Sequence, residues 1–272
     1  MKKYFPSSEL IINEDGSVFH LHVKPEWLAD KVILVGDENK ECEVESREFK
    51  TITGTYKGKR ITVVSTGIGC DNIDIVMNEL DALANIDFVT REEKDQFRQL
   101  ELVRIGTCGG LQPNTPVGTF VCSQKSIGFD GLLNFYAGRN AVCDLPFERA
   151  FLNHMGWSGN MCAPAPYVID ANEELIDRIA KDDMVRGVTI AAGGFFGPQG
   201  RELRIPLEAF EYKGYKITNF EMESSALAGL SRLMGHKAMT VCMVIANRLI
   251  KEANTGYKNT IDTLIKTVLD RI

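Results

Sequence analysis

The hydrophobic and polar positions along this chain predict strands and helices in alternation. Period-two alternation or a short apolar run ending in glycine or polar residues indicates a strand, and apolar residues three or four positions apart indicate a helix. The predicted strands cover residues 18–23, 32–35, 51–56, 60–65, 102–111, 119–127, 187–192, 215–220 and 240–246. The predicted helices cover residues 73–83, 172–181, 206–212, 226–233 and 257–272. This order is typical of an α/β fold, and we expect residues 1–272 to form a single domain.

Two stretches do not follow this alternation. Residues 85–100 are rich in charge and predict a solvated helix or an insertion. Residues 128–166 are irregular, carry aromatic residues and cysteines, and exceed the length of an ordinary connection. We interpret this second stretch as a lid or a contact between subunits.

The predicted strands end in glycines or polar side chains that are suited to hold a ligand. In open α/β sheets, ligands bind beside the carboxyl ends of the strands. We therefore expect a single composite site at this edge. The residues at the strand ends are Gly36, Gly67, Thr107, Phe195, Glu221 and Arg248.

Glu221 and Glu223 stand one residue apart where a predicted strand gives way to a helix. Residues two apart on extended backbone share a face, so both carboxylates can point at one ligand. The alternative is structural, because acidic residues in a first helical turn complement the helix dipole and Ser224 or Ser225 can cap the helix.

Arg104 lies in an apolar strand that ends in Thr107 and the pair Gly109-Gly110. Arginine is seldom buried without an anionic partner. A guanidinium, a hydroxyl and glycine-exposed amides supply converging donors for a tetrahedral oxyanion. We favour phosphate as this anion, and the alternative is an internal ion pair.

The loop of residues 193–201 mixes aromatic surface with an amide and a guanidinium. A flat heterocycle would stack on Phe195 while Gln199 and Arg201 address its polar edge. The alternative is a surface loop that happens to carry two polar residues.

Composition limits the classes of partner and compartment. The formal net charge is -6 without a basic run, so we expect neither nucleic acid nor a membrane as a partner. Seven scattered cysteines without a C-x-x-C pair favour reduced thiols in the cytoplasm. The start of the chain lacks the apolar stretch of a signal peptide, and the apolar run of residues 238–246 is too short to cross a bilayer.

A metal site is not expected. The alternation of residues 18–23 predicts a half-buried strand with Phe19, Leu21 and Val23 on one face and His20 and His22 on the other. No third ligand follows at a suitable spacing. Contact with a ligand or a neighbouring subunit explains the histidines better.

With these motifs in place, the chain resembles the first nucleoside phosphorylase family, and within it most closely the uridine phosphorylases. The resemblance runs from about Val18 to Arg248, and the order of its short motifs is more specific than any one of them. The matching pieces are Val18-Phe19-His20, Gly36-Asp37, Ser46-Arg47-Glu48-Phe49, Ser65-Thr66-Gly67-Ile68-Gly69, Arg104-Ile105-Gly106-Thr107, Gln199-x-Arg201, Glu221-Met222-Glu223-Ser224 and Asn247-Arg248.

The resemblance implies a three-layer αβα sandwich around a central mixed, largely parallel sheet. It also implies a homo-oligomer built from dimers, with a hexamer as the expected ring, and a site between two subunits. No cofactor is implied beyond phosphate as co-substrate. Some uridine phosphorylases hold a monovalent cation near the residue that matches Glu48.

The same resemblance assigns a role to each candidate residue. Phosphate would be held by Gly36, Lys40, Arg104 and Thr107, with Arg47 arriving from the partner subunit. Ribose would be held by Met222 and Glu223 beside Glu221, with a partner's His20 at the 5′-hydroxyl. Uracil would be bound by Phe195, Gln199 and Arg201, with Arg248 near its carbonyl.

The implied reaction is reversible phosphorolysis of uridine to uracil and ribose 1-phosphate, catalysed by a pentosyltransferase of pyrimidine salvage. Glycosidic cleavage leaves an oxocarbenium and a base anion, so Glu223 near the sugar and Arg248 near the base are the expected catalytic residues. Loss of either side chain is expected to lower the rate at least ~100-fold.

Departures from the family pattern leave alternatives open. Lys40 stands where the family usually has an arginine that contacts phosphate. A lysine cannot make the bidentate hydrogen bonds to phosphate that an arginine makes. Purine-cleaving relatives usually carry an aspartate at the position of Asn247. The alternatives are a purine nucleoside phosphorylase, a nucleosidase that uses water, and a catalytically silent nucleoside-binding protein.

Overall fold

The computed structural model describes residues 2–34, 40–159, 164–199, 207–247, 249–250, 252–253, 256 and 258–272. Its strands are β1 (Lys31–Leu34), β2 (Lys40–Ser46), β3 (Phe49–Tyr56), β4 (Lys59–Ser65), β5 (Ile86–Asp87), β6 (Glu92–Glu93), β7 (Glu101–Gly110), β8 (Phe120–Gly128), β9 (Tyr167–Asp170), β10 (Val185–Ala191), β11 (Glu211–Tyr212), β12 (Tyr215–Glu221), β13 (Lys237–Asn247) and β14 (Glu252–Ala253). Its α-helices are α1 (Cys70–Asn85), α2 (Arg139–Val142), α3 (Leu145–His154), α4 (Glu173–Ile179), α5 (Ser224–Met234) and α6 (Lys258–Arg271). Two 3₁₀ turns, η1 (Pro25–Trp27) and η2 (Leu132–Phe135), complete the set.

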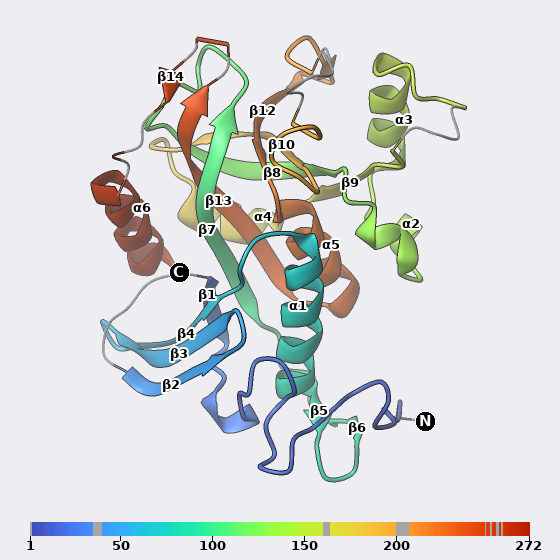
Figure 1. Cartoon of the computed structure of the whole chain (residues 1–272), viewed down its shortest axis with the longest axis vertical. Coiled ribbons are helices and arrows are strands. Elements are labelled where there is room, and N and C mark those ends of the chain that lie inside the picture. Colours follow the sequence, from blue (N-terminus) through green and yellow to red (C-terminus); the bar gives the residue numbers. More distant parts are fainter. Residues whose placement is uncertain are drawn as a thin grey trace.

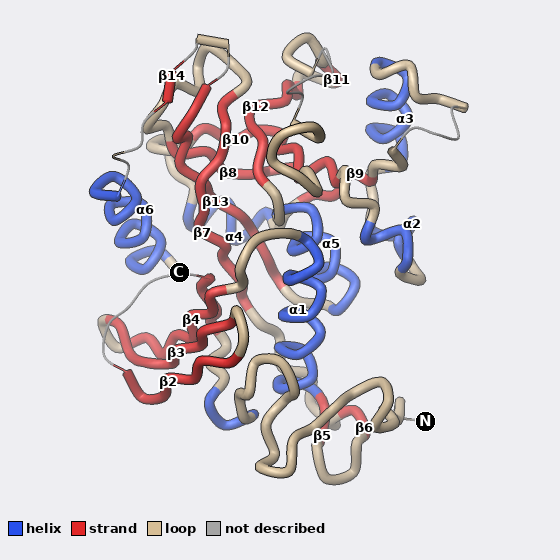
Figure 2. The backbone as a smooth tube through the Cα atoms, in the orientation of Figure 1, coloured by secondary structure: helices blue, strands red, loops and turns tan. Residues whose placement is uncertain are grey.

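The main sheet is mixed and runs in the order β11-β12-β10-β8-β13-β7-β1-β4-β3-β2. From β12 to β4 its neighbours are parallel except for the pair β8 and β13. The carboxyl end of β12 also pairs with the end of β7, where Asn219 meets Gly110 and Phe220 meets Gly109. Strands β7, β13, β8, β10 and β12 therefore close on themselves, and this closure brings the end of β12 beside the end of β7 (Figure 2).

Helices cover both faces of the sheet, because successive strand residues point to opposite sides. Val32 and Leu102 pack in a core with residues of α1 and α5. Their neighbours Ile33 and Val103 pack in a second core with residues of α4 and α6. Figure 1 shows α1 and α6 on opposite sides of β7, so the expected three-layer αβα sandwich is confirmed.

Most predicted elements are present, but the predicted strand at residues 18–23 is wrong. The chain there makes a tight turn in which Val18 donates to the carbonyl of Val23 and His22 donates to that of Val18. His22 has a φ of 53°, which is incompatible with a strand. The backbone amides of His20 and Leu21 are taken by the carboxylate of Glu79 on α1 instead of by a neighbouring strand.

Two other expectations need correction. Residues 85–100 form no helix: β5 and β6 pair as a small antiparallel hairpin, which agrees with the alternative of an insertion. The described part of the predicted helix at residues 206–212 is a turn followed by β11, because Glu211 and Tyr212 pair with β12.

The long region of residues 128–166 has structure of its own. Asp144 caps α3 by accepting from the amide of Phe147, and an aromatic cluster of Phe129, Phe151 and Trp157 packs beside it. Within the described residues, none of the helices is long and apolar enough to cross a membrane.

Candidate active site

A cavity of about 300 Å³ opens where β7, β12 and β13 end. It is lined by residues from strand ends and loops that lie far apart in the sequence. Seven of the predicted site residues line it: Arg104, Thr107, Phe195, Gln199, Glu221, Met222 and Glu223. The closure of β12 onto β7 explains why they meet here.

Glu221 is fixed by the first turn of α5. Its carboxylate accepts the amides of Glu223 (2.8 Å) and Ser224 (2.9 and 3.0 Å) and the hydroxyl of Ser224 (2.5 Å). These are the free N–H groups that every helix leaves at its start. Glu221 thus caps α5 through its own side chain, so the structural alternative holds for this carboxylate, although Ser224 and Ser225 are not the caps.

Arg104 lies between the two carboxylates. Its Nη1 donates to Oε2 of Glu221 at 3.1 Å and its Nη2 donates to Oε2 of Glu223. The exposed side-chain fractions are 12% for Arg104, 1% for Glu221 and 3% for Glu223, so all three charged groups are largely excluded from solvent. The internal ion pair that the sequence left open is therefore present, on the wall of the cavity.

The ionisation of this group follows from burial and mutual attraction. Burial disfavours the charged form of Arg104, but Glu223 and Glu221 more than offset this, and its pKa lies above the usual value. Burial raises the pKa of Glu221, while Arg104 opposes the rise. Every hydrogen bond described above for Glu221 is one that it accepts, which is the pattern of an ionised carboxylate.

Glu223 is held from its other side by the glycine-rich turn before α1. Its Oε1 accepts the amide of Gly69 at 2.6 Å. Gly69 has a φ of 107°, where a Cβ would also meet the carboxylate of Asp71 at 2.5 Å, so only glycine fits. Gly67 was among the strand-end residues expected to hold a ligand; in this turn, the amide of Gly69 binds and orients a side chain of the protein.

A second glycine makes room for the guanidinium. A Cβ at Gly106 would lie 2.7 Å from Nη1 of Arg104, so the arginine side chain lies directly over this residue. Thr107, Gly109 and Gly110 continue along the same strand and line the cavity, as the sequence predicted.

The lining of the cavity also has an apolar part. Phe195 is 57% exposed and packs edge-on against Phe196, with ring centroids 5.1 Å apart. Ile68 is 73% exposed, whereas Gln199 is buried. A planar ring bound in this cavity would cover exposed surface of Phe195 and Ile68.

His20 and Arg47 do not line the cavity. The guanidinium of Arg47 lies 5.1 Å from the ring centroid of Phe19, and that ring meets the ring of His20 edge-on at 5.0 Å. The two residues thus form a cluster of their own through Phe19, and their role in the site of a partner subunit stays a prediction.

Three expected site residues, Gly36, Arg201 and Arg248, lie outside the described residues, as does the side chain of Lys40. Several lining residues were not predicted: Ile68, Cys108, Phe220, Ile245 and Ala246. Ile68 lies inside the motif Ser65-Thr66-Gly67-Ile68-Gly69 that was quoted from the sequence. Ile245 lies where the register between β13 and β7 shifts, a feature that no sequence pattern indicates.

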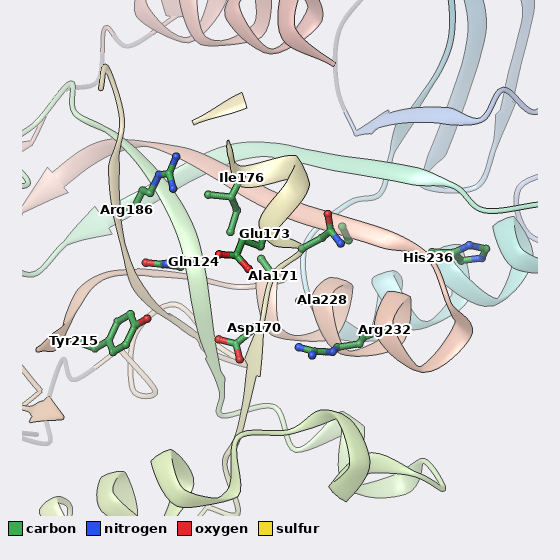
Figure 3. Close-up of a pocket in the computed structure, with 12 residues that line it drawn as sticks. Gln124, Asp170, Ala171, Glu173, Ile176, Arg186, Tyr215, Ala228, Arg232 and His236 are labelled. Atoms are coloured by element: carbon green, nitrogen blue, oxygen red, sulfur yellow. The ribbon is translucent and has the colours of Figure 1, made fainter. Parts of the chain in front are cut away.

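A larger cavity of about 450 Å³ lies near the amino ends of β10, β12 and β13 (Figure 3). None of the predicted site residues lines it. Arg186 there donates to the carboxylate of Asp177 and the carbonyl of Ala180, and Asp170 accepts from Lys125. These charges hold the fold together, so the smaller cavity is the candidate active site.

Among the described residues, no group of three or more histidine, cysteine or acidic side chains is arranged to hold a metal ion.

Fold and cavity together define a three-layer α/β protein whose site sets a buried guanidinium between two carboxylates. Residues 26–269 match the model of the phosphorylase superfamily, and the chain belongs to this superfamily.

Individual relatives agree with this assignment. The chain is 29% identical over 272 residues to a uridine phosphorylase of Thermococcus kodakarensis, and the match covers 93% of this chain and 85% of that protein. It is 26% identical over 249 residues to a DeoD-type purine nucleoside phosphorylase of Bacillus subtilis, with 87% and 90% covered. Its structure is similar to that of a Trypanosoma brucei nucleoside phosphorylase described as showing uridine phosphorylase activity, with a TM-score of 0.82, 27% identity, and 96% and 97% of the two chains covered.

Proposed function

We propose that this chain is a uridine phosphorylase, a pentosyltransferase that converts uridine and phosphate into uracil and ribose 1-phosphate. The observation that carries the proposal is the contact of Arg104 with Glu223 on the wall of one cavity. In this proposal Arg104 supplies the anion site and Glu223 the carboxylate for the sugar hydroxyls, and the two side chains are in contact. The similarity to proteins named as uridine phosphorylases or described as having that activity supports the choice of substrate.

In this mechanism the carboxylate of Glu223 accepts hydrogen bonds from ribose hydroxyls. Its negative charge stabilises the oxocarbenium that develops as the glycosidic bond breaks. Arg104 and the hydroxyl of Thr107 hold phosphate against the opposite face of the sugar, where a phosphate oxygen attacks the anomeric carbon. No covalent enzyme intermediate is needed, and positioning supplies much of the rate.

The base occupies the apolar part of the cavity. Uracil stacks on Phe195, and the amide of Gln199 binds its polar edge. We assign stabilisation of the leaving uracil anion to Arg248 and Arg201, on the strength of the family resemblance. The anion leaves with its charge paired, and it takes a proton from water after release.

The proposed enzyme is a homo-oligomer of dimers, expected to be a hexamer. In each dimer, His20 and Arg47 of one subunit contribute to the active site of the other. Its only co-substrate is phosphate, and a monovalent cation near Glu48 stays a prediction. We place the enzyme in the cytoplasm, where thiols remain reduced, because the six described cysteines are unpaired.

The test of this function is release of base from uridine, thymidine, inosine and adenosine, with and without phosphate. We expect uridine to be cleaved only when phosphate is present, because water cannot take the charged contacts of Arg104. Ultraviolet absorbance follows the reaction. Release without phosphate would instead identify a nucleosidase, and an absence of turnover on every substrate a silent binding protein.

The purine-directed alternative is disfavoured by the contacts of Asn247. Its Nδ2 donates to the carbonyls of Thr115 (2.9 Å) and Gln112 (3.1 Å), and its Oδ1 accepts the amide of Leu249 at 3.0 Å. This residue is 1% exposed and does not line the cavity. An aspartate here would face two carbonyl oxygens without a hydrogen to donate.

We therefore expect Asn247→Asp to destabilise the protein rather than to create purine activity. Two buried carbonyls lose their donor, which costs about 2 to 3 kcal/mol in free energy of unfolding. Urea denaturation measures the loss, and Asn140→Asp on the surface helix α2 is the matched control. A stable Asn247→Asp variant that cleaves inosine would contradict both the contact analysis and the preference for uridine.

A further inference from the structure

Glu79 is a buried acid on α1 that the mechanism above does not use. It is 7% exposed, and its helix packs it beside the turn of residues 18–23. Within the described residues, the only basic side chain that the structure shows in contact with it is the ring of His20. Its negative charge is therefore balanced by hydrogen bonds from this turn.

Three of these bonds converge on the segment that carries His20. Oε1 of Glu79 accepts the His20 amide at 2.8 Å and contacts Nδ1 of the His20 ring at 2.6 Å, and Oε2 accepts the Leu21 amide at 2.8 Å. One carboxylate thus fixes both the backbone and the ring of the same histidine. A residue that served only to close the turn would need the two amides alone.

The contact with the ring also decides which nitrogen carries the hydrogen. An ionised carboxylate only accepts, so Nδ1 donates to it and Nε2 is left to interact with a ligand. Nε2 has no hydrogen-bond partner among the described residues, and the His20 side chain is 29% exposed. The ring of Phe19 meets the His20 ring edge-on, and the guanidinium of Arg47 lies over the ring of Phe19.

We propose that Glu79 is a positioning residue for substrate selection: it holds His20 so that Nε2 binds the free 5′-hydroxyl of a nucleoside in the site of a second copy of this chain. This inference rests on the proposed function. The class of ligand selected is a nucleoside with an unmodified 5′-hydroxyl, as opposed to one that lacks it.

Comparison of uridine with 5′-deoxyuridine tests the proposal, because only uridine has the group that Nε2 would bind. For Glu79→Gln we expect kcat/KM for uridine to fall about tenfold, the scale of one hydrogen bond, and kcat/KM for 5′-deoxyuridine to stay within about twofold. His20→Ala should show the same selective loss, and the double variant should be no worse than His20→Ala alone.

Controls separate this role from general damage to the turn. Glu14→Gln removes an exposed acid nearby, and His22→Asn replaces the neighbouring exposed histidine with a residue that tolerates its positive φ. Both should leave the two substrates unchanged. If Glu79→Gln does not fold, Glu79→Asp keeps the charge and shortens the reach, and the same selective loss is expected.

Equal losses on both substrates, or additive losses in the double variant, would overturn the role of Glu79 and leave a purely structural acid. Failure of the unmodified enzyme to cleave either substrate with phosphate would instead refute the proposed function. The two failures are thus distinguishable in one set of assays.

Discussion

Glu223→Ala is expected to lower kcat/KM for uridine phosphorolysis at least ~100-fold, the usual scale for deleting one electrostatic contact to a transition state. The carboxylate is nearly fully buried and is held by Arg104 on one oxygen and the Gly69 amide on the other. It is therefore already oriented before substrate arrives and requires little rearrangement in the transition state. The loss should appear mainly in kcat, because the developing charge on the sugar exists only there.

The measurement is the steady-state rate of uracil release at saturating phosphate. Glu26→Ala, at an exposed acid in η1, is the control and should retain full activity. Glu223→Gln separates charge from hydrogen bonding, since the amide still binds hydroxyls but cannot stabilise a cation. Turnover of Glu223→Ala close to that of the unmodified enzyme would remove Glu223 from the mechanism.

The sequence predicted the parts of the site that depend on local pattern. Strand periodicity located Arg104 and Thr107 within β7, and the change from strand to helix located Glu221 and Glu223. These predictions succeed because burial of alternate residues is recorded in the local sequence.

Contacts made over long sequence distances could not be predicted in this way. Glu79 takes backbone amides 58 and 59 residues away, and that contact turned a strand-like pattern at residues 18–23 into a turn. The pairing of β12 with β7 and the bond from Gly69 to Glu223 likewise depend on tertiary structure alone. Alternation shows which faces are apolar, but not which group satisfies the backbone.

In the proposed mechanism, the guanidinium of Arg104 would contact both phosphate and Glu223. One buried side chain would then link the two substrate sites and also stabilise the fold.

Arg104→Met is expected to destabilise the protein by about 3 to 5 kcal/mol at neutral pH, because it leaves two buried carboxylates without their partner. The same change removes the proposed phosphate contact, so phosphorolysis should fall by about 100- to 1,000-fold. Urea denaturation gives the first quantity, and uracil release under conditions where the variant is folded gives the second. Arg104→Lys is the matched comparison: it keeps one positive charge and much of the stability, but a single ammonium cannot bridge both carboxylates and phosphate.

The pH dependence of the Arg104→Met variant distinguishes this explanation from a packing defect. Burial raises the pKa of Glu221 above 4.5, its ordinary value, and removal of the guanidinium raises it further. The folded variant then binds a proton that the unfolded chain does not bind, so its stability increases as the pH falls through the raised pKa. The deficit relative to the unmodified protein should therefore shrink between about pH 8 and pH 5. A stability deficit that stays constant across this pH range would mean that the loss comes from packing around the methionine. Charge balance with the two carboxylates would then not explain why Arg104 stabilises the protein.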